Sequence, residues 1–254
     1  MLFVVDIGNT NIVLGLYEND TLLHCWRVGT DDKKTTDEYE VLLRNFFQKV
    51  NLESRYVDGA IISSVVPMLT GVFYDLCQRV FDVSSLIVGP GLKTGMPIKM
   101  DNPREVGADR IANGVAAYAL YGGPVIVADF GTATTFDVVS KDGEYIGGVI
   151  SPGISISMEA LFQRAAKLPR VELMQPSSSI GRNTVAGMQA GIMGQVIGGI
   201  NYTVDSIRRE LEFNAPVVAT GGLAELVGPH SEAIDIINPI LTLEGLKLIY
   251  HRNV

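Results

Sequence analysis

Pro124-Val125-Ile126-Val127-Ala128-Asp129-Phe130-Gly131-Thr132-Ala133-Thr134-Thr135 is the stretch that decides the fold. An uncharged run ends abruptly at a carboxylate, and a glycine and three threonines follow within seven residues. Residues 125–127 predict a buried strand and residues 136–139 a second strand, so a turn lies between them. Gly131 permits a tight turn and a close approach of the backbone to a ligand. Because threonine hydroxyls and turn amides can donate to phosphate oxygens, we expect a phosphate-binding hairpin.

The first residues of the chain repeat this pattern. Residues 2–5 predict a strand, Asp6-Ile7-Gly8-Asn9-Thr10 predicts the turn, and residues 12–16 predict the next strand. The two aspartates, Asp6 and Asp129, lie about 120 residues apart. The pair indicates two similar halves that close on one nucleotide. The alternative is that each aspartate merely caps an ordinary turn.

Length and composition limit the possible classes of protein. The 254 residues suffice for one large domain or two of ordinary size, and 47% of them are hydrophobic. A net charge of -8 argues against a nucleic-acid-binding surface, where a basic stripe is expected. Two cysteines, Cys25 and Cys77, are too few for a disulfide framework or a structural zinc site and fit a reducing cytoplasm.

Neither secretion nor membrane insertion is expected. The chain opens without a basic region, and Asp6 interrupts its first apolar run. Residues 111–128 and 183–204 are uncharged and long enough to cross a bilayer, but glycines and polar residues break both. Buried or interfacial helices account for them better.

The order of predicted elements is the same in both halves of the chain. Three strands precede the first helix, which differs from a Rossmann unit, where strands and helices alternate from the start. In the first half we expect strands at 2–5, 12–16, 21–28, 58–64 and 85–88 and helices at 36–50, 67–80 and 105–121. In the second half we expect strands at 125–128, 134–140, 145–150, 216–219 and 235–237 and helices at 154–167, 184–213 and 241–250.

The predicted helix 184–213 is unusually rich in glycine and therefore has few bulky side chains along part of its length. Five glycines lie between residues 183 and 204, and each weakens a helix by about 1 kcal/mol relative to alanine. Close backbone packing against another helix would compensate for them. That helix could belong to the same chain or to a dimer partner.

Three further groups of residues could carry chemistry. Asp6 and Asp129 are candidates for cation binding, because Mg²⁺ prefers one or two carboxylates together with water and substrate phosphates. Asp109 could act as a general base on a hydroxyl, and Arg110 could hold a carboxylate or phosphate, although such a pair is often structural. Thr220-Gly221-Gly222 suits either backbone contact with a nucleotide or a structural turn.

Several familiar nucleotide-binding motifs are missing from the sequence. Asp129-Phe130-Gly131 spells a protein-kinase tripeptide, but no His-Arg-Asp loop precedes it. The chain also lacks the G-x-x-x-x-G-K-[ST] loop, which excludes the P-loop mechanism.

The doubled arrangement with two phosphate hairpins resembles the acetate and sugar kinase, Hsp70 and actin superfamily, whose fold is α/β. That resemblance implies duplicated ribonuclease-H-like (actin-like ATPase) domains, each a mixed five-stranded sheet flanked by helices, at residues 1–115 and 116–254. The second would carry the dimer-forming helix. Within the superfamily, five motifs in order resemble the type III pantothenate kinases: Asp6-Ile7-Gly8-Asn9-Thr10-Asn11, Asn102-Pro103-Arg104-Glu105-Val106-Gly107-Ala108-Asp109-Arg110, Asp129-Phe130-Gly131-Thr132-Ala133-Thr134-Thr135, Gly147-Gly148-Val149-Ile150-Ser151-Pro152-Gly153 and Ala166-Lys167-Leu168-Pro169.

The family resemblance implies ATP-dependent phosphorylation of pantothenate, the first step of coenzyme A biosynthesis, by a cytoplasmic homodimer that requires Mg²⁺ and K⁺ or NH₄⁺. Carried over by position, Asp109 is the catalytic proton acceptor, Asp129 binds the monovalent cation and Asp6 binds Mg²⁺. The implied ATP contacts are Asp6, Ile7, Gly8, Asn9, Thr10, Asn11, Ile12, Val13 and Thr132. The implied pantothenate contacts are Gly107, Ala108, Asp109, Arg110 and Thr184. One position departs from the family pattern: Met100 stands where the family often has an aromatic residue.

Two other functions remain open at this stage. One is a non-catalytic regulator, since accessory transcription factors resemble this family; the presence of Asp109 and Asp129 argues against it. The other is a different reaction on the same fold, such as a phosphatase or a sugar kinase.

Overall fold

The computed structural model describes residues 1–165 and 167–254. Ala166, which opens the last of the five motifs and falls within the helix expected at 154–167, lies outside the described residues. The chain divides into two compact units. Unit 1 comprises residues 1–96, 101–116 and 241–254, and unit 2 comprises residues 97–100 and 117–240.

Each unit contains one mixed five-stranded sheet, as the sequence predicts. The strand orders are β3-β2-β1-β4-β5 and β8-β7-β6-β9-β10, so the second sheet repeats the topology of the first. In both, the central strand pairs antiparallel with the following strand and parallel with the fourth. The expectation of a duplicated α/β fold is therefore confirmed.

The elements of unit 1 follow the predicted order closely. They are β1 (Leu2–Ile7), β2 (Asn11–Glu18), β3 (Thr21–Gly29), α1 (Thr36–Lys49), η1 (Ser54–Tyr56), β4 (Gly59–Ser64), α2 (Pro67–Phe81), β5 (Leu86–Ile87), η2 (Pro103–Glu105), the first part of α3 (Ala108–Tyr121) and α7 (Leu241–His251).

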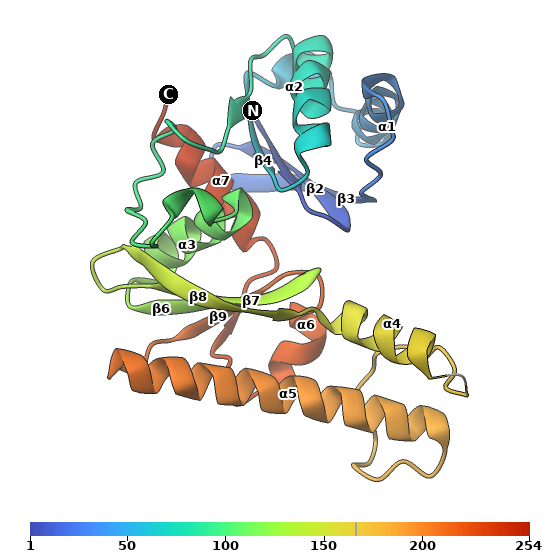
Figure 1. Ribbon diagram of the computed structural model, residues 1–254. Helices are drawn as coiled ribbons and strands as arrows, with labels where there is room; N and C mark the ends of the chain where they lie inside the picture. The colour runs from blue at the N-terminus through green and yellow to red at the C-terminus, as the bar shows by residue number, and fades with distance from the viewer. Residues whose placement is uncertain (166) are drawn as a thin grey trace. The chain divides into compact units, whose positions relative to one another are not determined.

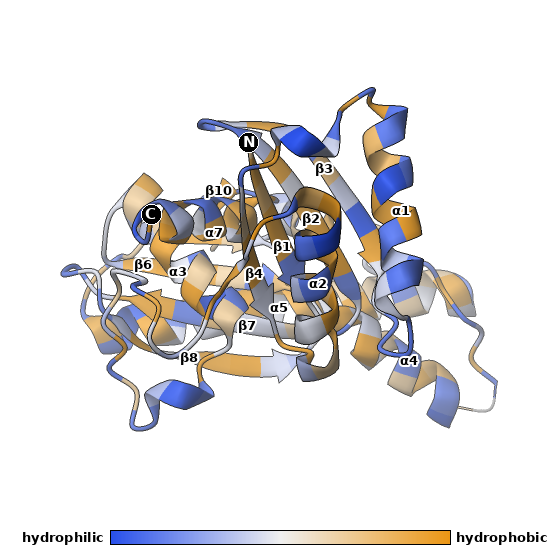
Figure 2. Cartoon of the chain, turned by 90° about the horizontal axis from the view of Figure 1, so that it is seen from above, coloured by the Kyte–Doolittle hydropathy of each residue, from blue (hydrophilic) through white to orange (hydrophobic). Residues whose placement is uncertain are grey.

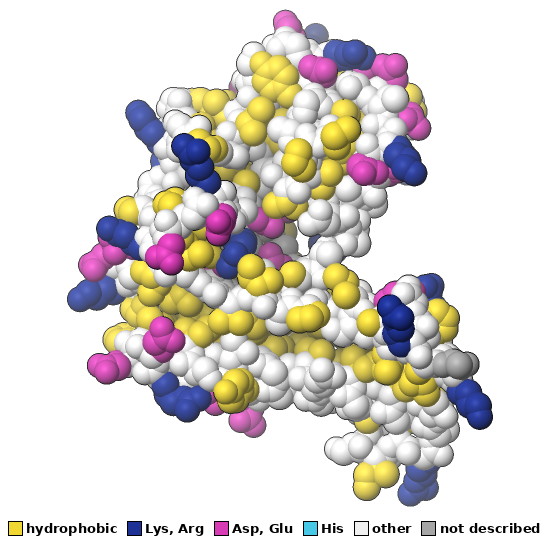
Figure 3. Space-filling view, in the orientation of Figure 1, with side chains coloured by type: hydrophobic (Ala, Val, Ile, Leu, Met, Phe, Trp, Pro, Cys, Tyr) yellow, Lys and Arg dark blue, Asp and Glu magenta, His cyan; other side chains and the backbone are white. Residues whose placement is uncertain are grey.

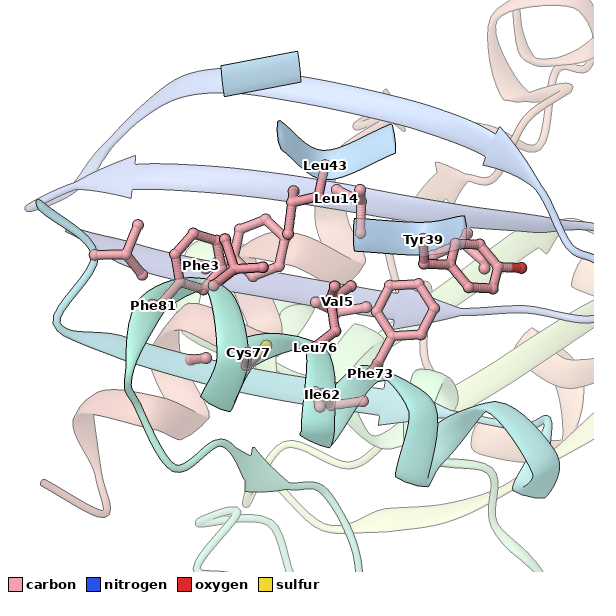
Figure 4. Close-up of a cluster of buried hydrophobic side chains, with 14 of the residues drawn as sticks. Phe3, Val5, Leu14, Tyr39, Leu43, Ile62, Phe73, Leu76, Cys77 and Phe81 are labelled. Atoms are coloured by element: carbon pink, nitrogen blue, oxygen red, sulfur yellow. The ribbon is translucent and has the colours of Figure 1, made fainter. Parts of the chain in front are cut away.

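Helices α1 and α2 cover one face of sheet 1. Thr35 caps α1 together with Glu38 in a capping box, which satisfies backbone donors at the first turn. Figure 2 shows hydrophobic and hydrophilic residues alternating around α1, as expected of a helix with one buried face. Alternate strand residues point into this core, where Figure 4 shows Phe3, Val5, Leu14, Ile62 and Phe73 together.

The opposite face of sheet 1 is covered by α7. Leu243 lies 3.0 Å from the position that a Cβ on Gly15 of β2 would occupy, and a Cβ on Gly245 would collide with the carbonyl of Ala112. The expected division at 115/116 placed residues 241–254 in the second half. The structure instead packs α7 against β1 and β4, because Leu2, Val4 and Ile61 would otherwise leave an apolar face exposed.

The elements of unit 2 repeat the scheme with fewer helices. They are the last part of α3, β6 (Val125–Phe130), β7 (Ala133–Val139), β8 (Tyr145–Pro152), α4 (Ile154–Arg164), α5 (Thr184–Leu211), β9 (Val217–Thr220), α6 (Ala224–Val227), η3 (Gly228–His230) and β10 (Ile236–Ile237). In Figure 1 the long helix α5 runs along one face of this sheet. Its apolar residues form a core with alternate residues of β6, β7 and β9.

Helix boundaries differ from the prediction by two or more residues in three places. The helix expected at 154–167 ends at Arg164, because Ala165 is extended. The helix expected at 105–121 begins only at Ala108, because Asn102 caps a separate 3-10 turn over Pro103–Glu105 and Val106 is extended. The helix expected at 184–213 ends at Leu211, because Glu212 adopts a left-handed conformation with φ of 52°.

Candidate active site

The first acidic hairpin joins β1 to β2 through Gly8, Asn9 and Thr10. Gly8 donates its N–H to the carbonyl of Asn11 at 3.0 Å. From the end of β3, the hydroxyl of Thr30 donates to the Gly8 carbonyl at 2.6 Å, and its N–H donates to the Thr10 carbonyl at 3.0 Å. The turn is thereby held from both sides and remains exposed.

The residues predicted to contact ATP here divide into two groups. Asn9, Thr10 and Asn11 are exposed and can offer side chains to a ligand. Ile7 and Ile12 are completely buried in the core beneath α1 and α2, so only their backbone could reach a phosphate.

Asp6 lies on the other face of sheet 1, because strand side chains alternate. It is aligned with Val13 on β2 and with Ser63 on β4. Its side chain is therefore directed away from the apolar core formed by Phe3, Val5 and Ile7.

Asp109 lies in the first turn of α3. One carboxylate oxygen, Oδ1, accepts the backbone N–H of Arg110 at 2.8 Å, and Gly107 closes the first helical hydrogen bond with Ile111 at 3.1 Å. Burial raises the pKa of the Asp109 carboxyl above its usual value, although the N–H and the charge of Arg110 oppose the shift. A raised carboxyl pKa is characteristic of a group that must accept and release a proton.

Unit 1 brings Asp6 and Asp109 to the same edge of its sheet. Val65, which directly follows β4, donates its N–H to the carbonyl of Ile7 at 3.0 Å. A methyl carbon of Val65 also lies 3.6 Å from the position of a Cβ on Gly107. The start of α3 is thus placed beside the strand ends that carry Asp6. A side chain at Gly107 would itself collide with the Asp109 carboxylate, which explains the glycine.

The second acidic hairpin joins β6 to β7 through Gly131 and Thr132. Gly131 donates its N–H to the carbonyl of Ala133 at 3.1 Å. A Cβ on Gly153 would collide with the carbonyl of Thr132, so the end of β8 packs directly on this turn. Thr132 is partly exposed at the tip.

Asp129 is enclosed by backbone. Gly221 has φ of +90°, and a Cβ there would collide with the Asp129 carboxylate. Gly131 lies on its other side, with the position of its Cβ 3.6 Å from Oδ1 of Asp129. Two glycines therefore let the main chain approach one carboxylate closely, which is an arrangement suited to a small cation.

Thr184 and Arg110, both expected to contact substrate, lie in different units. Thr184 is exposed at the first turn of α5, which Asn183 caps by accepting the N–H of Ala186 at 2.9 Å. Arg110 follows Asp109 in α3 of unit 1 and is partly buried.

A buried polar group in unit 2 was missed by the reasoning from sequence. The fully buried Asp137 accepts hydrogen bonds from the Tyr145 hydroxyl at 2.6 Å and from the Thr135 hydroxyl at 3.1 Å. Thr135 is aligned with Asp129 across β6 and β7. The period of two between Thr135 and Asp137 was the available signal, since it places both on one face of the strand.

The described ranges contain neither a preformed metal cluster nor a membrane-spanning helix. Among residues 1–165 and 167–254, no three histidine, cysteine or acidic side chains cluster as metal ligands, so a cation at Asp6 or Asp129 would depend on other oxygens as well. Within the same residues, no helix is both long and apolar enough to cross a membrane.

Two sheets of identical topology, each with an acidic turn after its central strand, define the actin-like ATPase and sugar-kinase fold. A Sinorhizobium meliloti structure described as a 2-dehydro-3-deoxygalactonokinase superposes with a TM-score of 0.59 at 13% identity, over 99% of this chain and 96% of that one. A Campylobacter jejuni structure described as a Baf family transcriptional activator superposes with a TM-score of 0.62 at 18% identity, over 99% and 98%. At these identities the likeness shows the fold alone.

Sequence comparison identifies the family. The model of the type III pantothenate kinase family matches residues 2–206. Type III pantothenate kinases from Moorella thermoacetica and Geobacter sulfurreducens are 54% and 53% identical over 253 residues, with 100% of this chain covered and 100% and 99% of theirs. The chain belongs to the type III pantothenate kinase family.

Proposed function

We propose that this chain transfers a phosphoryl group from ATP to pantothenate, the reaction of its family, with Asp109 as the general base. The product is 4′-phosphopantothenate, and the reaction is the first step of coenzyme A biosynthesis. The observation that carries the assignment of the base is the Asp109 carboxyl, partly buried at a helix start beside the strand end of Asp6.

Asp109 accepts the proton of the primary hydroxyl of pantothenate as that oxygen attacks the γ-phosphorus of ATP, and ADP leaves as the bond to its bridging oxygen breaks. The raised pKa makes its carboxylate a stronger base than an exposed aspartate. Gly107, Ala108 and Arg110 surround it and are proposed to contact the substrate, with Arg110 directed at the pantothenate carboxylate.

The two hairpins are proposed to bind ATP. Residues 6–13 supply turn amides and the exposed hydroxyl and amide side chains of Asn9, Thr10 and Asn11, and Thr132 is proposed as a further ATP contact. Without a P-loop lysine, amides, threonines and cations share the task of neutralising phosphate charge.

Two cations fit the residues present. Asp6 is a single carboxylate at a strand end, which suits Mg²⁺, because this ion keeps waters and substrate phosphates as its other ligands. Asp129 lies in a backbone cradle that any side chain at Gly221 would fill, and is proposed to hold K⁺ or NH₄⁺. The cations supply charge neutralisation when bound.

Helix α5 is proposed to form the homodimer. Gly187, Gly191, Gly194 and Gly198 are exposed, and a Cβ on any of them meets nothing within 4 Å. Their spacing places them on one helix face, so this face offers bare backbone for a second helix to pack against. Figure 3 shows hydrophobic side chains on unit 2 over β8 and α4. The exposed apolar residues of these two elements are Ile146, Val149, Ile150, Ile156 and Leu161. Thr184, at the start of α5, would then contact pantothenate near the dimer interface.

We further propose a cytoplasmic enzyme with ATP and pantothenate as its ligands and no nucleic-acid partner. The negative net charge supports the last point, because a nucleic acid would be repelled.

An ATP-consumption assay over a panel of hydroxy acids and sugars tests the proposed function. We expect turnover with pantothenate alone, dependent on Mg²⁺ and lost when K⁺ is replaced by Na⁺. Turnover with a sugar and not with pantothenate would contradict the acceptor, and turnover unchanged in Na⁺ would contradict the monovalent-cation requirement.

A further inference from the structure

Each unit carries the same pair of side chains next to its acidic turn. Asp6 on β1 is aligned with Ser63 on the parallel strand β4, and Asp129 on β6 is aligned with Thr220 on the parallel strand β9. Aligned residues of neighbouring parallel strands point to the same face, and the strands lie about 4.8 Å apart. In both units, therefore, a hydroxyl lies beside the carboxylate proposed to bind a cation.

Both hydroxyls are buried and have no hydrogen-bond partner. Ser63 is 0% exposed and Thr220 is 1% exposed, and neither side-chain oxygen meets a partner among the described residues. A buried polar group left in this state costs about 1–3 kcal/mol. Valine or alanine at either position would remove that cost.

A buried hydroxyl without a partner thus occurs at the equivalent position of both units, although the two units differ in sequence. Among residues 1–165 and 167–254, the two other buried hydroxyls without partners are those of Tyr17 and Ser85, and neither is aligned with a carboxylate in a strand. The two hydroxyls that are aligned with a carboxylate, those of Ser63 and Thr220, therefore lie at the two proposed cation sites. This coincidence points to a bound ligand as their missing hydrogen-bond or coordination partner.

Of the two hydroxyls, that of Thr220 is held more firmly beside its carboxylate. Gly221 follows it with φ of +90°, and a Cβ there would collide with the Asp129 carboxylate and the backbone of Phe130. This close contact fixes the end of β9 relative to the Asp129 carboxylate, so the hydroxyl and the carboxylate are held side by side.

We propose that the Thr220 hydroxyl is a second oxygen ligand of the monovalent cation held by Asp129, and that Ser63 does the same for the cation at Asp6. Hard cations such as these take oxygen ligands. The inference rests on the proposed role of Asp129 and extends it to a residue that neither the family resemblance nor the comparisons assign.

The test compares Thr220→Val, which removes the hydroxyl at nearly constant volume, with Thr220→Ser, which keeps it. The melting temperature of each is measured in KCl and in NaCl of equal ionic strength, with Mg²⁺ and ATP and without pantothenate. An ion that binds only the folded state raises the melting temperature. We expect the wild type and Thr220→Ser to melt higher in KCl than in NaCl.

For Thr220→Val we expect a weaker K⁺ response, with the K⁺ concentration for half-maximal stabilisation raised at least about tenfold. In NaCl this variant melts no lower than the wild type, because an unsatisfied buried hydroxyl has been removed, which separates loss of the ligand from loss of the fold. Asp129→Asn serves as the reference that removes the proposed carboxylate.

The two possible failures give different results. A full K⁺ response in Thr220→Val together with its loss in Asp129→Asn would overturn the inference and leave the proposed role of Asp129 intact. A full response in Asp129→Asn, or none in the wild type, would overturn the proposed cation site and the inference with it.

Discussion

The two acidic hairpins share a topology but differ in what holds their turns. In unit 1 the turn has three residues, and Thr30 supports it with two hydrogen bonds. In unit 2 the turn has two residues, and the backbone of Gly153 and Gly221 packs against it and its aspartate. The first turn is therefore open to a ligand and held by a side chain, whereas the second is enclosed by glycines that tolerate no replacement.

The largest expected effect is a loss of stability from a substitution at the enclosed turn of unit 2. Gly221→Ala forces a non-glycine residue into a positive φ and drives its Cβ into Asp129 and Phe130. The two costs together predict a destabilisation of about 3 kcal/mol or more in chemical denaturation. Gly122→Ala is the matched control, because Gly122 has φ of +78° with nothing within 4 Å of the new Cβ, and should cost about 1 kcal/mol. Equal losses in the two variants would show that the cradle around Asp129 is not close-packed.

The corresponding test in unit 1 affects turnover more than stability. Gly107→Ala places a Cβ against the Asp109 carboxylate and displaces it. Because a misplacement of about 1 Å can cost about 100-fold in rate, we expect kcat to fall by that order. Gly71→Ala in α2, where a Cβ meets nothing within 4 Å, should leave kcat unchanged. A Gly107→Ala enzyme with normal kcat would mean that Asp109 need not hold its present position.

The units also differ in their helices, since α5 alone exposes a row of glycines. Gly191→Leu fits a single chain but obstructs a second helix, so we expect the dimer to weaken by about 1–3 kcal/mol. Light scattering coupled to size-exclusion chromatography measures the change, with Gly71→Leu on the exposed side of α2 as control. A Gly191→Leu dimer as tight as the wild type would place the interface elsewhere.

The smallest predicted effect concerns stability and pH. Burial raises the pKa of Asp109 in the folded state, so the ionised carboxylate opposes folding once the pH exceeds that pKa. Asp109→Asn should therefore gain melting temperature relative to the wild type at pH 8. The gain should shrink as the pH falls through the raised pKa towards the ordinary aspartate pKa, and below the ordinary pKa it should no longer change. A difference that is constant with pH would contradict the raised pKa.

Local sequence patterns predicted most of the fold. Both hairpins were predicted because an apolar strand ending in aspartate and glycine permits few alternatives. The order of strands and helices along the chain was predicted as well, because the second half repeats the pattern of the first. The place of α7 was not predictable, because its partners β1 and β4 lie more than 170 residues earlier in the chain. The helix expected at 105–121 started late because the capping role of Asn102 competed with helix formation.

The sequence predicted which residues form the candidate site, but it predicted less well what packs around them. The motif identified Asp109, but the collision that explains Gly107 depends on the path of the backbone. Asp137 and the hydroxyls of Ser63 and Thr220 depend on strand register, which the sequence alone leaves unspecified.

The central claim is that Asp109 accepts the proton of the attacking hydroxyl, and the turnover number of Asp109→Asn with ATP and pantothenate tests it most directly. We predict a loss of about 10²–10⁴-fold in kcat, with circular dichroism and melting temperature showing an intact fold. A folded Asp109→Asn enzyme with near-normal kcat would contradict the account.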